Sequence, residues 1–540
     1  MPTIPVKEPS PKNNAKLTDI SDLWAAGVDL SELLLTAELM HEPEPDPDIE
    51  AEAALSVHSG GDPDDGTVID LLDSTGERMN DLGSARILVR LCGSDVRWCQ
   101  AMPGEGWMLW DGAKWCPDTT RRVYRLADSV GEEWRRRAPP DITDLVTDAK
   151  DRKQLESRKK HMAHADKCES AAGYRAMLEM LRSRISIAVT PDAWDADPLV
   201  VNTPDATYDL RRVRRYPPRR ADLVTRATAI GASTDDCPIW KAFLLQIMAG
   251  NADMVDFLQR AAGYCLTGDT SEQCMFVAYG TGGNGKGVFL NTLKAIIGTY
   301  AQGVQVETFV DRKKGGIPND LAALAGARFV LCSEPDEGAP LAEGLIKTVT
   351  GQDTVTARFL NREFFDFIPQ FKLWMMTNHK PPIKGTDKGI WRRLRLVPFT
   401  VSIPKAEQDR ELANKLKAEY PAILAWMIDG LKEWRRIGLS PPAAVIEASE
   451  QYRQEMDTFA EFLDDRCSVT SIGTAQNGDV YASYTEWAKD NGLRPRSHMW
   501  MTSELKKRGF VQREGRKHGR IWEGFTLDIK ADDGSPPSMF

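Results

Sequence analysis

The glycine-rich stretch GTGGNGKG, residues 280–287, most constrains what this chain can fold into. It follows the apolar run MFVAYG (275–280), which is typical of a buried strand. It precedes VFLNTLKAIIG (288–298), which has the apolar spacing of a helix and a closing glycine. A strand, a glycine-rich loop and a helix in this order turn backbone N–H groups inward around phosphates. The stretch therefore predicts an α/β core that binds a nucleotide.

The loop residues have separate expected roles. Lys286 is expected to reach the β and γ phosphates. Gly287 stands where the phosphate-loop pattern has Ser or Thr, whose hydroxyl ordinarily contacts Mg²⁺. The metal must therefore take a water there or depend more on downstream carboxylates. The residues expected to contact the nucleotide are Gly280, Gly282, Gly283, Asn284, Gly285, Lys286 and Gly287.

Carboxylates after the next apolar strand are candidate catalytic groups. RFVLCS (328–333) predicts a strand, and Glu334, Asp336 and Glu337 follow it. Carboxyl ends of parallel strands border the ligand crevice of an α/β sheet. One of these acids can hold Mg²⁺ there while another activates the attacking water.

Two further segments have a functional and a structural interpretation. FKLWMMTN (371–378) predicts a third strand, and Asn378 at its end either orients the water or senses the γ phosphate, or simply ends the strand. Arg392 and Arg393 precede another strand. They either supply an arginine to the phosphates of a neighbouring subunit or belong to an ion-pairing surface.

Composition narrows the class of protein. A chain of 540 residues with 42% hydrophobic and 27% charged residues predicts two to four soluble domains. We expect no membrane span, because no apolar run is long enough to cross a bilayer. We expect no secretory signal, because the stretch MPTIPVKEPSPKNN is polar and contains no apolar h-region. The nine cysteines fall singly, which favours reduced thiols over a disulfide frame or a zinc site. The net charge of -10 argues against a uniformly basic surface but leaves room for local patches.

These elements, in this order and spacing, resemble the superfamily 3 helicases, specifically the phage and plasmid primase-helicase family that includes the poxvirus primase-helicase. The stretches that carry the resemblance are GYCLTGDTSEQCMFVAYGTGGNGKG, LAGARFVLCSEPDEGAPLAEGLIKTVTGQDTVTAR and FKLWMMTNHKPPIKGTDKGIWRRLRLVPF, with WDADPLVVNTPDATYDL in the region that precedes the core. The resemblance implies an AAA+-like P-loop core with a mainly parallel sheet. It also implies a homo-oligomeric ring, usually a hexamer, with ATP and Mg²⁺ between subunits and single-stranded or forked DNA as substrate.

The resemblance also implies residue roles. Lys286 matches the phosphate-loop lysine, Glu334 the main acid and metal ligand of the second motif, and Asn378 the asparagine of the third. Either Asp336 or Glu337 assists Glu334. Arg393 matches the arginine finger, and Lys347 the lysine of the motif after the acids.

A β-hairpin over residues 356–369 is expected to project into the ring channel. Together with Lys347, the hairpin cations Arg358 and Arg362 are the expected DNA contacts, because phosphate contact needs no base reading. The hairpin aromatics either stack on bases or form the hairpin core; they are Phe359, Phe364, Phe365 and Phe367.

Six parts are expected along the chain. They are a partly disordered segment with an acidic linker (1–79), an α+β or helical accessory domain (80–235), the ATPase core (236–404), a helical segment (405–470), a winged-helix-like domain (471–528) and a tail (529–540). The basic run RRVRRYPPRR (211–220) is either a solvated face or a nucleic-acid contact. The winged-helix-like domain binds either DNA or a protein.

The function expected from this resemblance is an ATP-dependent replicative DNA helicase of a phage, prophage or plasmid, working in the bacterial host cytoplasm. One alternative is an AAA+ ATPase that loads or recruits replication proteins without unwinding DNA. Another is the helicase part of a primase-helicase, because LTDISDLWAAGVDLSELL resembles the end of a Toprim primase module. A primase supplied by a separate protein, or another replication protein, is an expected partner.

Overall fold

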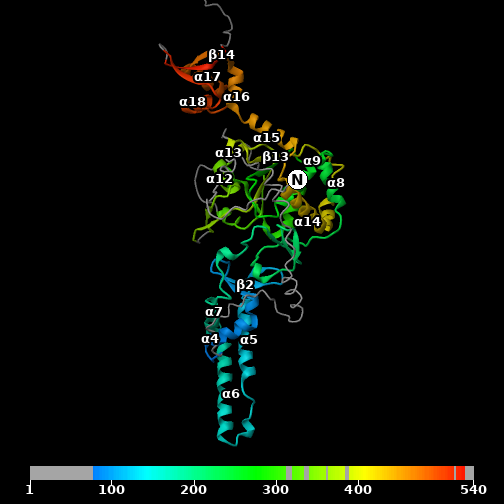
Figure 1. The fold of residues 1–540 in the computed structure, drawn as a ribbon, viewed down its shortest axis with the longest axis vertical. Coiled ribbons are helices and arrows are strands. Elements are labelled where there is room, and N and C mark those ends of the chain that lie inside the picture. The colour runs from blue at the N-terminus through cyan, green and yellow to red at the C-terminus, as the bar shows by residue number, and fades with distance from the viewer. Residues whose placement is uncertain are drawn as a thin grey trace, which may run out of the picture. The chain divides into compact units, whose positions relative to one another are not determined.

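The computed structural model describes residues 77–311, 319–333, 340–359, 363–383, 388–515 and 519–528 (Figure 1). All of them belong to one compact unit, Ile69–Phe540. The expected N-terminal segment with its acidic linker, apart from residues 77–79, and the expected tail lie outside the described residues. No helix within these ranges is both long and apolar enough to cross a membrane.

Four helices and a small antiparallel sheet make up the first described region. Asn80 caps the first helix, because its side chain accepts a hydrogen bond from the Gly83 N–H at 2.8 Å. Asp148 and Asp151 form a reciprocal capping box at the third helix. The elements are α4 (Asp81–Cys92), α5 (Arg122–Arg137), α6 (Ala149–Cys168), α7 (Ala171–Arg182), β1 (Val96–Trp98), β2 (Trp107–Trp110) and β3 (Trp115–Pro117). The apolar faces of these elements, apart from β3, share one core around Trp107 and Trp134, whereas Trp115 of β3 belongs to a smaller cluster with Met108 and Trp194.

A second antiparallel sheet has the order β4-β5-β6 and precedes the core. Its strands are β4 (Val200–Asn202), β5 (Thr207–Asp209) and β6 (Arg214–Tyr216). Two side chains from the following region fix β4. The backbone N–H of Asn202 donates to the Tyr300 hydroxyl at 3.1 Å, and buried Arg328 donates to the Val200 carbonyl at 2.6 Å.

A five-stranded sheet with the order β13-β7-β12-β9-β8 forms the core, and every neighbouring pair is parallel. The strands are β7 (Met275–Tyr279), β8 (Ala301–Val304), β9 (Phe329–Cys332), β12 (Lys372–Thr377) and β13 (Leu394–Pro398). Successive residues of β7 enter different cores: Met275 and Val277 pack on one face, Phe276 and Ala278 on the other. The sheet is therefore buried on both faces, as parallel sheets generally are. The expectation of an α/β fold with a mainly parallel sheet is confirmed.

Helices and one hairpin surround this sheet. The helices are α8 (Pro238–Ile247), α9 (Ala252–Tyr264), α10 (Lys286–Ile297), α11 (Asn319–Ala322), α12 (Glu343–Thr350) and α13 (Lys388–Trp391). The hairpin is the antiparallel pair of β10 (Val355–Ala357) and β11 (Phe365–Phe367). Thus the expected hairpin before the third motif is present.

The remaining elements follow β13 in the chain. The helices are α14 (Leu412–Ile437), α15 (Ala443–Glu455), α16 (Thr458–Arg466), α17 (Asn477–Asp490) and α18 (His498–Lys507). The strands are β14 (Cys467–Gln476), β15 (Val511–Gly515) and β16 (Gly519–Leu527), in the antiparallel order β14-β16-β15. Within this part, the helices α17 and α18 are followed by the paired strands β15 and β16.

Candidate nucleotide-binding site

The glycine-rich loop joins the end of β7 directly to the start of α10, as the sequence predicts. Three glycines adopt backbone angles that L side chains rarely take: Gly280 at φ 153°, Gly283 at 77° and Gly285 at 83°. A Cβ at Gly285 would collide with Ile247 and lie 3.1 Å from a ring carbon of Phe243. These positions require glycine for the loop to keep its shape.

Lys286 lies beneath the loop and is nearly buried, with 4% of its surface exposed. Its ammonium donates to the carbonyl of Gly280, to that of Thr281 at 3.3 Å and to the Asn378 side-chain oxygen at 3.1 Å. A buried lysine has few rotamers, and these acceptors hold its charge at the loop. The structure thus brings together Lys286 and Asn378, which are 92 residues apart in the chain.

Asn284 fixes the loop to the chain after β13. Its side-chain nitrogen donates to the Phe399 carbonyl at 3.1 Å, and its oxygen accepts from the Lys286 N–H at 3.4 Å. The Ile403 N–H donates to the Gly283 carbonyl at 3.0 Å. Phe399 and Ile403 were not among the residues expected from the sequence. They act through backbone atoms, so their residue types carry no signal.

Gly287 has open space beside it. An added Cβ would lie 3.8 Å from the Met376 sulfur and 3.9 Å from the Asn291 side-chain nitrogen, which are ordinary van der Waals distances. The position supplies no hydroxyl to a metal. Steric crowding at the Cβ position is not the reason, because a Cβ fits there.

The expected acids Glu334, Asp336 and Glu337 lie outside the described residues. The strand that precedes them, β9, ends at Cys332. It is the neighbour of β12, which in turn is the neighbour of β7. The carboxyl ends of these parallel strands therefore lie side by side at the same end of the sheet as the loop. Among the described residues, no three His, Cys, Asp or Glu side chains gather as a metal site.

Arg393 lies at the amino ends of the strands, opposite to the ends that carry the loop. Its carbonyl accepts from the Met275 N–H at 2.8 Å, at the start of β7, whereas the loop follows the end of that strand. Five strand residues at about 3.3 Å each separate the two levels by roughly 16 Å. Arg393 donates to the Gly389 carbonyl at 2.8 Å and does not approach the loop of its own chain.

The expected DNA contacts lie on two elements. Lys347 is half-buried in the last turn of α12. Arg358 follows β10, with its guanidinium 4.8 Å from the centre of the Phe364 ring. Arg362 lies outside the described residues.

The hairpin aromatics divide into two pairs. Phe365 and Phe367 are half-buried and pack on the core, whereas Phe359 and Phe364 are exposed by 41% and 52%. Phe359 stacks on Phe365 at 5.8 Å between ring centres. The hairpin core thus uses the inner pair and leaves the outer pair accessible.

Two family descriptions match parts of the chain. Residues 85–249 match the family described as D5 N terminal like, and residues 278–393 match a family described as "Family of unknown function (DUF5906)". The first match covers the region that was expected to resemble the primase-helicase family upstream of its ATPase core. That resemblance is confirmed.

Named relatives come from viruses. "Putative helicase L207/L206" of Acanthamoeba polyphaga mimivirus is 28% identical over 260 residues, covering 44% of this chain and 27% of that protein. "Putative helicase 022R" of Frog virus 3 (isolate Goorha) is 28% identical over 273 residues, covering 46% of this chain and 28% of that protein. The matched region is thus only about a quarter of the length of these relatives.

Solved structures also align with most of the chain. "The A form apo structure of NrS-1 C terminal region-CTR(305-718)" aligns at a TM-score of 0.43 and 10% identity. The alignment covers 84% of this chain and all of that one.

Proposed function

Residues 85–249 match the family described as D5 N terminal like, and the chain is related to viral proteins named as helicases. From this premise we propose that the chain is an ATP-dependent DNA helicase. The single observation that carries the proposal is the contact of Lys286 with Asn378 beneath a glycine-rich loop. This contact joins the side chain expected to bind phosphate to one expected to act on its hydrolysis.

The loop is proposed to bind the phosphates of ATP. Its glycines open the backbone toward the start of α10, where N–H groups and the helix dipole favour negative charge. The Lys286 ammonium would exchange a carbonyl or Asn378 for a β or γ phosphate oxygen. Asn284 keeps the loop in place through Phe399 while this exchange occurs.

Asn378 is proposed to orient the attacking water or to sense the γ phosphate. Attack of water on the γ phosphorus breaks the bond to the β–γ bridging oxygen and yields ADP and phosphate. One of Glu334, Asp336 and Glu337 would accept the proton of the water. Mg²⁺ would neutralise phosphate charge, with Glu334 as its proposed protein ligand in place of a hydroxyl at residue 287.

The remaining parts of the proposal concern assembly and DNA. We propose a superfamily 3, AAA+-like ring, hexameric by resemblance, in which Arg393 stabilises the transition state in a neighbouring subunit. Arg393 lies at the end of the strands opposite to the loop of its own chain, and this position supports action on another chain. Lys347, Arg358 and Arg362 are the proposed contacts to the translocating strand, in a phage, prophage or plasmid replication system of a bacterial cytoplasm.

A second candidate function is a loader that hydrolyses ATP without unwinding DNA. The C-terminal elements α16–α18 and the sheet β14-β16-β15 have their own apolar core, which favours a separate binding module. This module is proposed to be a winged helix that binds DNA or a replication protein. A primase, in the same or a separate protein, is a proposed partner.

The deciding experiment compares wild type, Lys286→Ala and Lys294→Ala in ATP hydrolysis and forked-DNA unwinding. Lys294 is a matched control, because it lies on the same helix α10 and outside the loop. We expect Lys286→Ala to lose at least a hundredfold in both activities and Lys294→Ala to keep them within twofold. Hydrolysis that depends on Lys286 without unwinding of either fork polarity would replace the helicase with the loader. Hydrolysis independent of Lys286 would exclude both.

A further inference from the structure

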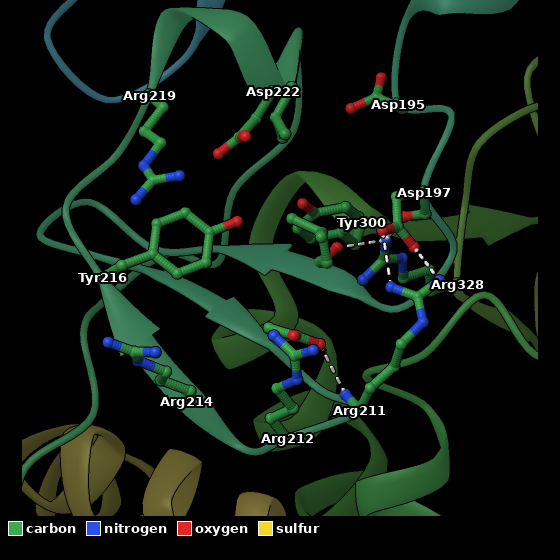
Figure 2. Close-up of a pocket in the computed structure, with 13 residues that line it drawn as sticks. Asp195, Asp197, Arg211, Arg212, Arg214, Tyr216, Arg219, Asp222, Tyr300 and Arg328 are labelled. Carbon is green, nitrogen blue, oxygen red and sulfur yellow. Dashed lines mark hydrogen bonds and ion pairs between the residues drawn. The ribbon is translucent and has the colours of Figure 1, made fainter. Parts of the chain in front are cut away.

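A cavity of about 390 Å³ lies beside the sheet β4-β5-β6 (Figure 2), and its lining contains no residue of the glycine-rich loop. The basic run RRVRRYPPRR (211–220) supplies much of its wall. This run has no role in the nucleotide site described above. Its six arginines divide into two sets with different surroundings.

The first set is engaged in ion pairs within the fold. Each member has a carboxylate partner: Arg211 contacts Asp197 at 2.7 Å, Arg215 contacts Asp205 at 3.1 Å, and Arg220 contacts Asp95 at 2.7 Å. Arg211 binds both carboxylate oxygens of Asp197. These three arginines therefore have a structural role, because each is paired with a carboxylate of the fold.

The second set comprises Arg212, Arg214 and Arg219, all of which are exposed and line the cavity. In the described part of the chain, none of the three has a carboxylate within ion-pair distance. Arg214 and Tyr216 alternate along β6 with Arg215, so they face the cavity while Arg215 faces Asp205. Figure 2 shows Arg219 beside Tyr216. The Arg219 guanidinium lies 4.7 Å from the centre of the Tyr216 ring.

Two of the acids that line the cavity accept hydrogen bonds from backbone N–H groups. Asp195 accepts from the Thr225 N–H at 2.8 Å, and Asp209 accepts from the Arg211 N–H at 2.9 Å. Burial and the neighbouring Asp222 carboxylate raise the pKa of Tyr216.

Buried Arg328 adds a fixed positive charge to the cavity wall. Its guanidinium lies 4.3 Å from the Tyr300 ring centre and donates to the Leu266 carbonyl at 2.7 Å. These contacts fix Arg328 in the wall. The cations available to a ligand at the rim of the cavity are Arg212, Arg214 and Arg219.

We propose that this cavity is a phosphate-binding site that takes the backbone of single-stranded DNA, through Arg212, Arg214 and Arg219. Guanidinium groups form paired, charge-assisted hydrogen bonds with phosphate oxygens. The contact requires no base recognition, which suits a protein that moves along any sequence. The Tyr216 ring holds Arg219 in position from one side. This inference rests on the proposed action on DNA and extends it to the region upstream of the ATPase core.

The test measures binding of a fluorescent oligo-dT strand by anisotropy over a salt series, without ATP. The variant is the triple Arg212→Gln, Arg214→Gln, Arg219→Gln in the full chain. We expect at least a tenfold loss of affinity. We also expect a salt slope that is smaller by about 2, because each phosphate contact on a single strand contributes about 0.7.

Two controls separate the site from total charge. The triple Arg152→Gln, Lys153→Gln, Lys159→Gln removes the same charge from exposed positions of α6. Arg215→Gln removes one arginine from the same strand on the opposite face. Both are expected to bind DNA within twofold of wild type. Thermal unfolding checks that each variant is folded, and the single variant Arg214→Gln, expected to lower the slope by about 0.7, replaces a triple that fails to fold.

The outcomes are distinct. Unchanged affinity and slope in the cavity triple would overturn the inference, as would equal losses in both triples. Calorimetry with inorganic phosphate identifies the source of the ligand: loss of phosphate binding with intact DNA binding would overturn the assignment to DNA. A wild type that binds no DNA would instead contradict the proposed function itself.

Discussion

Gly287 shows how one missing side chain changes what must hold the metal. The space beside it accepts a Cβ, and serine is a slightly better helix residue than glycine. We expect Gly287→Ser to fold and to reach half-maximal ATP hydrolysis at a severalfold lower Mg²⁺ concentration, because a hydroxyl there is an additional ligand. A Mg²⁺ titration of hydrolysis measures this. Gly285→Ser is the contrasting variant, since its φ of 83° and the contact with Ile247 predict loss of the loop. An unchanged Mg²⁺ dependence would show that the metal needs no ligand at residue 287.

Glu133 gives a prediction about pH. This buried carboxylate accepts hydrogen bonds from Arg136, Arg137 and Arg90, the shortest at 2.7 Å, and these lower its pKa to about 2. The lowered pKa means that Glu133 contributes its full stability above about pH 4.5 and loses it as the pH falls toward 2.

We expect Glu133→Gln to lower the free energy of unfolding by about 1–3 kcal/mol at pH 7, with a difference from wild type that shrinks below pH 4.5. Urea unfolding at a series of pH values measures this. Glu132→Gln, at the neighbouring exposed position, is the control and is expected to match wild type throughout. A loss that is constant from pH 7 to pH 3 would refute the ionic origin.

The hairpin β10–β11 is the element from which the outer aromatics reach solvent. Its strands are tied by the Thr356 hydroxyl, which donates to Asp366 at 2.6 Å. We expect Phe364→Ala to weaken oligo-dT binding about fivefold or more, because an aromatic face stacked on a base contributes about 1–3 kcal/mol. Ile368→Ala is the control, since Ile368 is similarly exposed but has no aromatic face. Equal affinities of wild type and Phe364→Ala would assign the outer aromatics to packing alone.

Sequence patterns predict elements best where several signals agree at one position. The run MFVAYG, the glycines and Lys286 each favour the same strand, loop and helix, and the structure has them there. The pairing of Asn378 with Lys286 depends on β12 lying beside β7, which is a property of the whole sheet. The contacts of Phe399 and Ile403 use backbone atoms and could not be read from residue types. The division of RRVRRYPPRR into two sets depends on carboxylates as distant as Asp95, which only the folded chain brings near.

At the scale of the whole molecule, the position of Arg393 makes the proposed ring testable by mixing. Lys286→Ala and Arg393→Ala should each be inactive alone. If Arg393 acts on the neighbouring subunit, a random mixed ring contains interfaces with both residues intact, so an equal mixture should recover about a quarter of wild-type hydrolysis. Mixing Lys286→Ala with Asn378→Ala is the control, and it should recover nothing if Asn378 and Lys286 serve the same site within one chain. Absence of recovery in the first mixture would place Arg393 outside the catalytic interface.

Strand β12 has a mechanical consequence for the two ends of the core. The hairpin strand β11 ends at Phe367, five residues before β12 begins, and Asn378 follows directly where β12 ends. Between them, β12 is hydrogen-bonded on both sides, to β7 and to β9, so it can shift only as a stiff rod. Under the proposed function, a bound phosphate would draw Lys286 away from Asn378, which follows the carboxyl end of β12. The amino end of the same strand leads to the hairpin. Under the proposed function, the six residues of β12, about 20 Å in length, would connect the nucleotide site directly to the hairpin proposed to contact DNA.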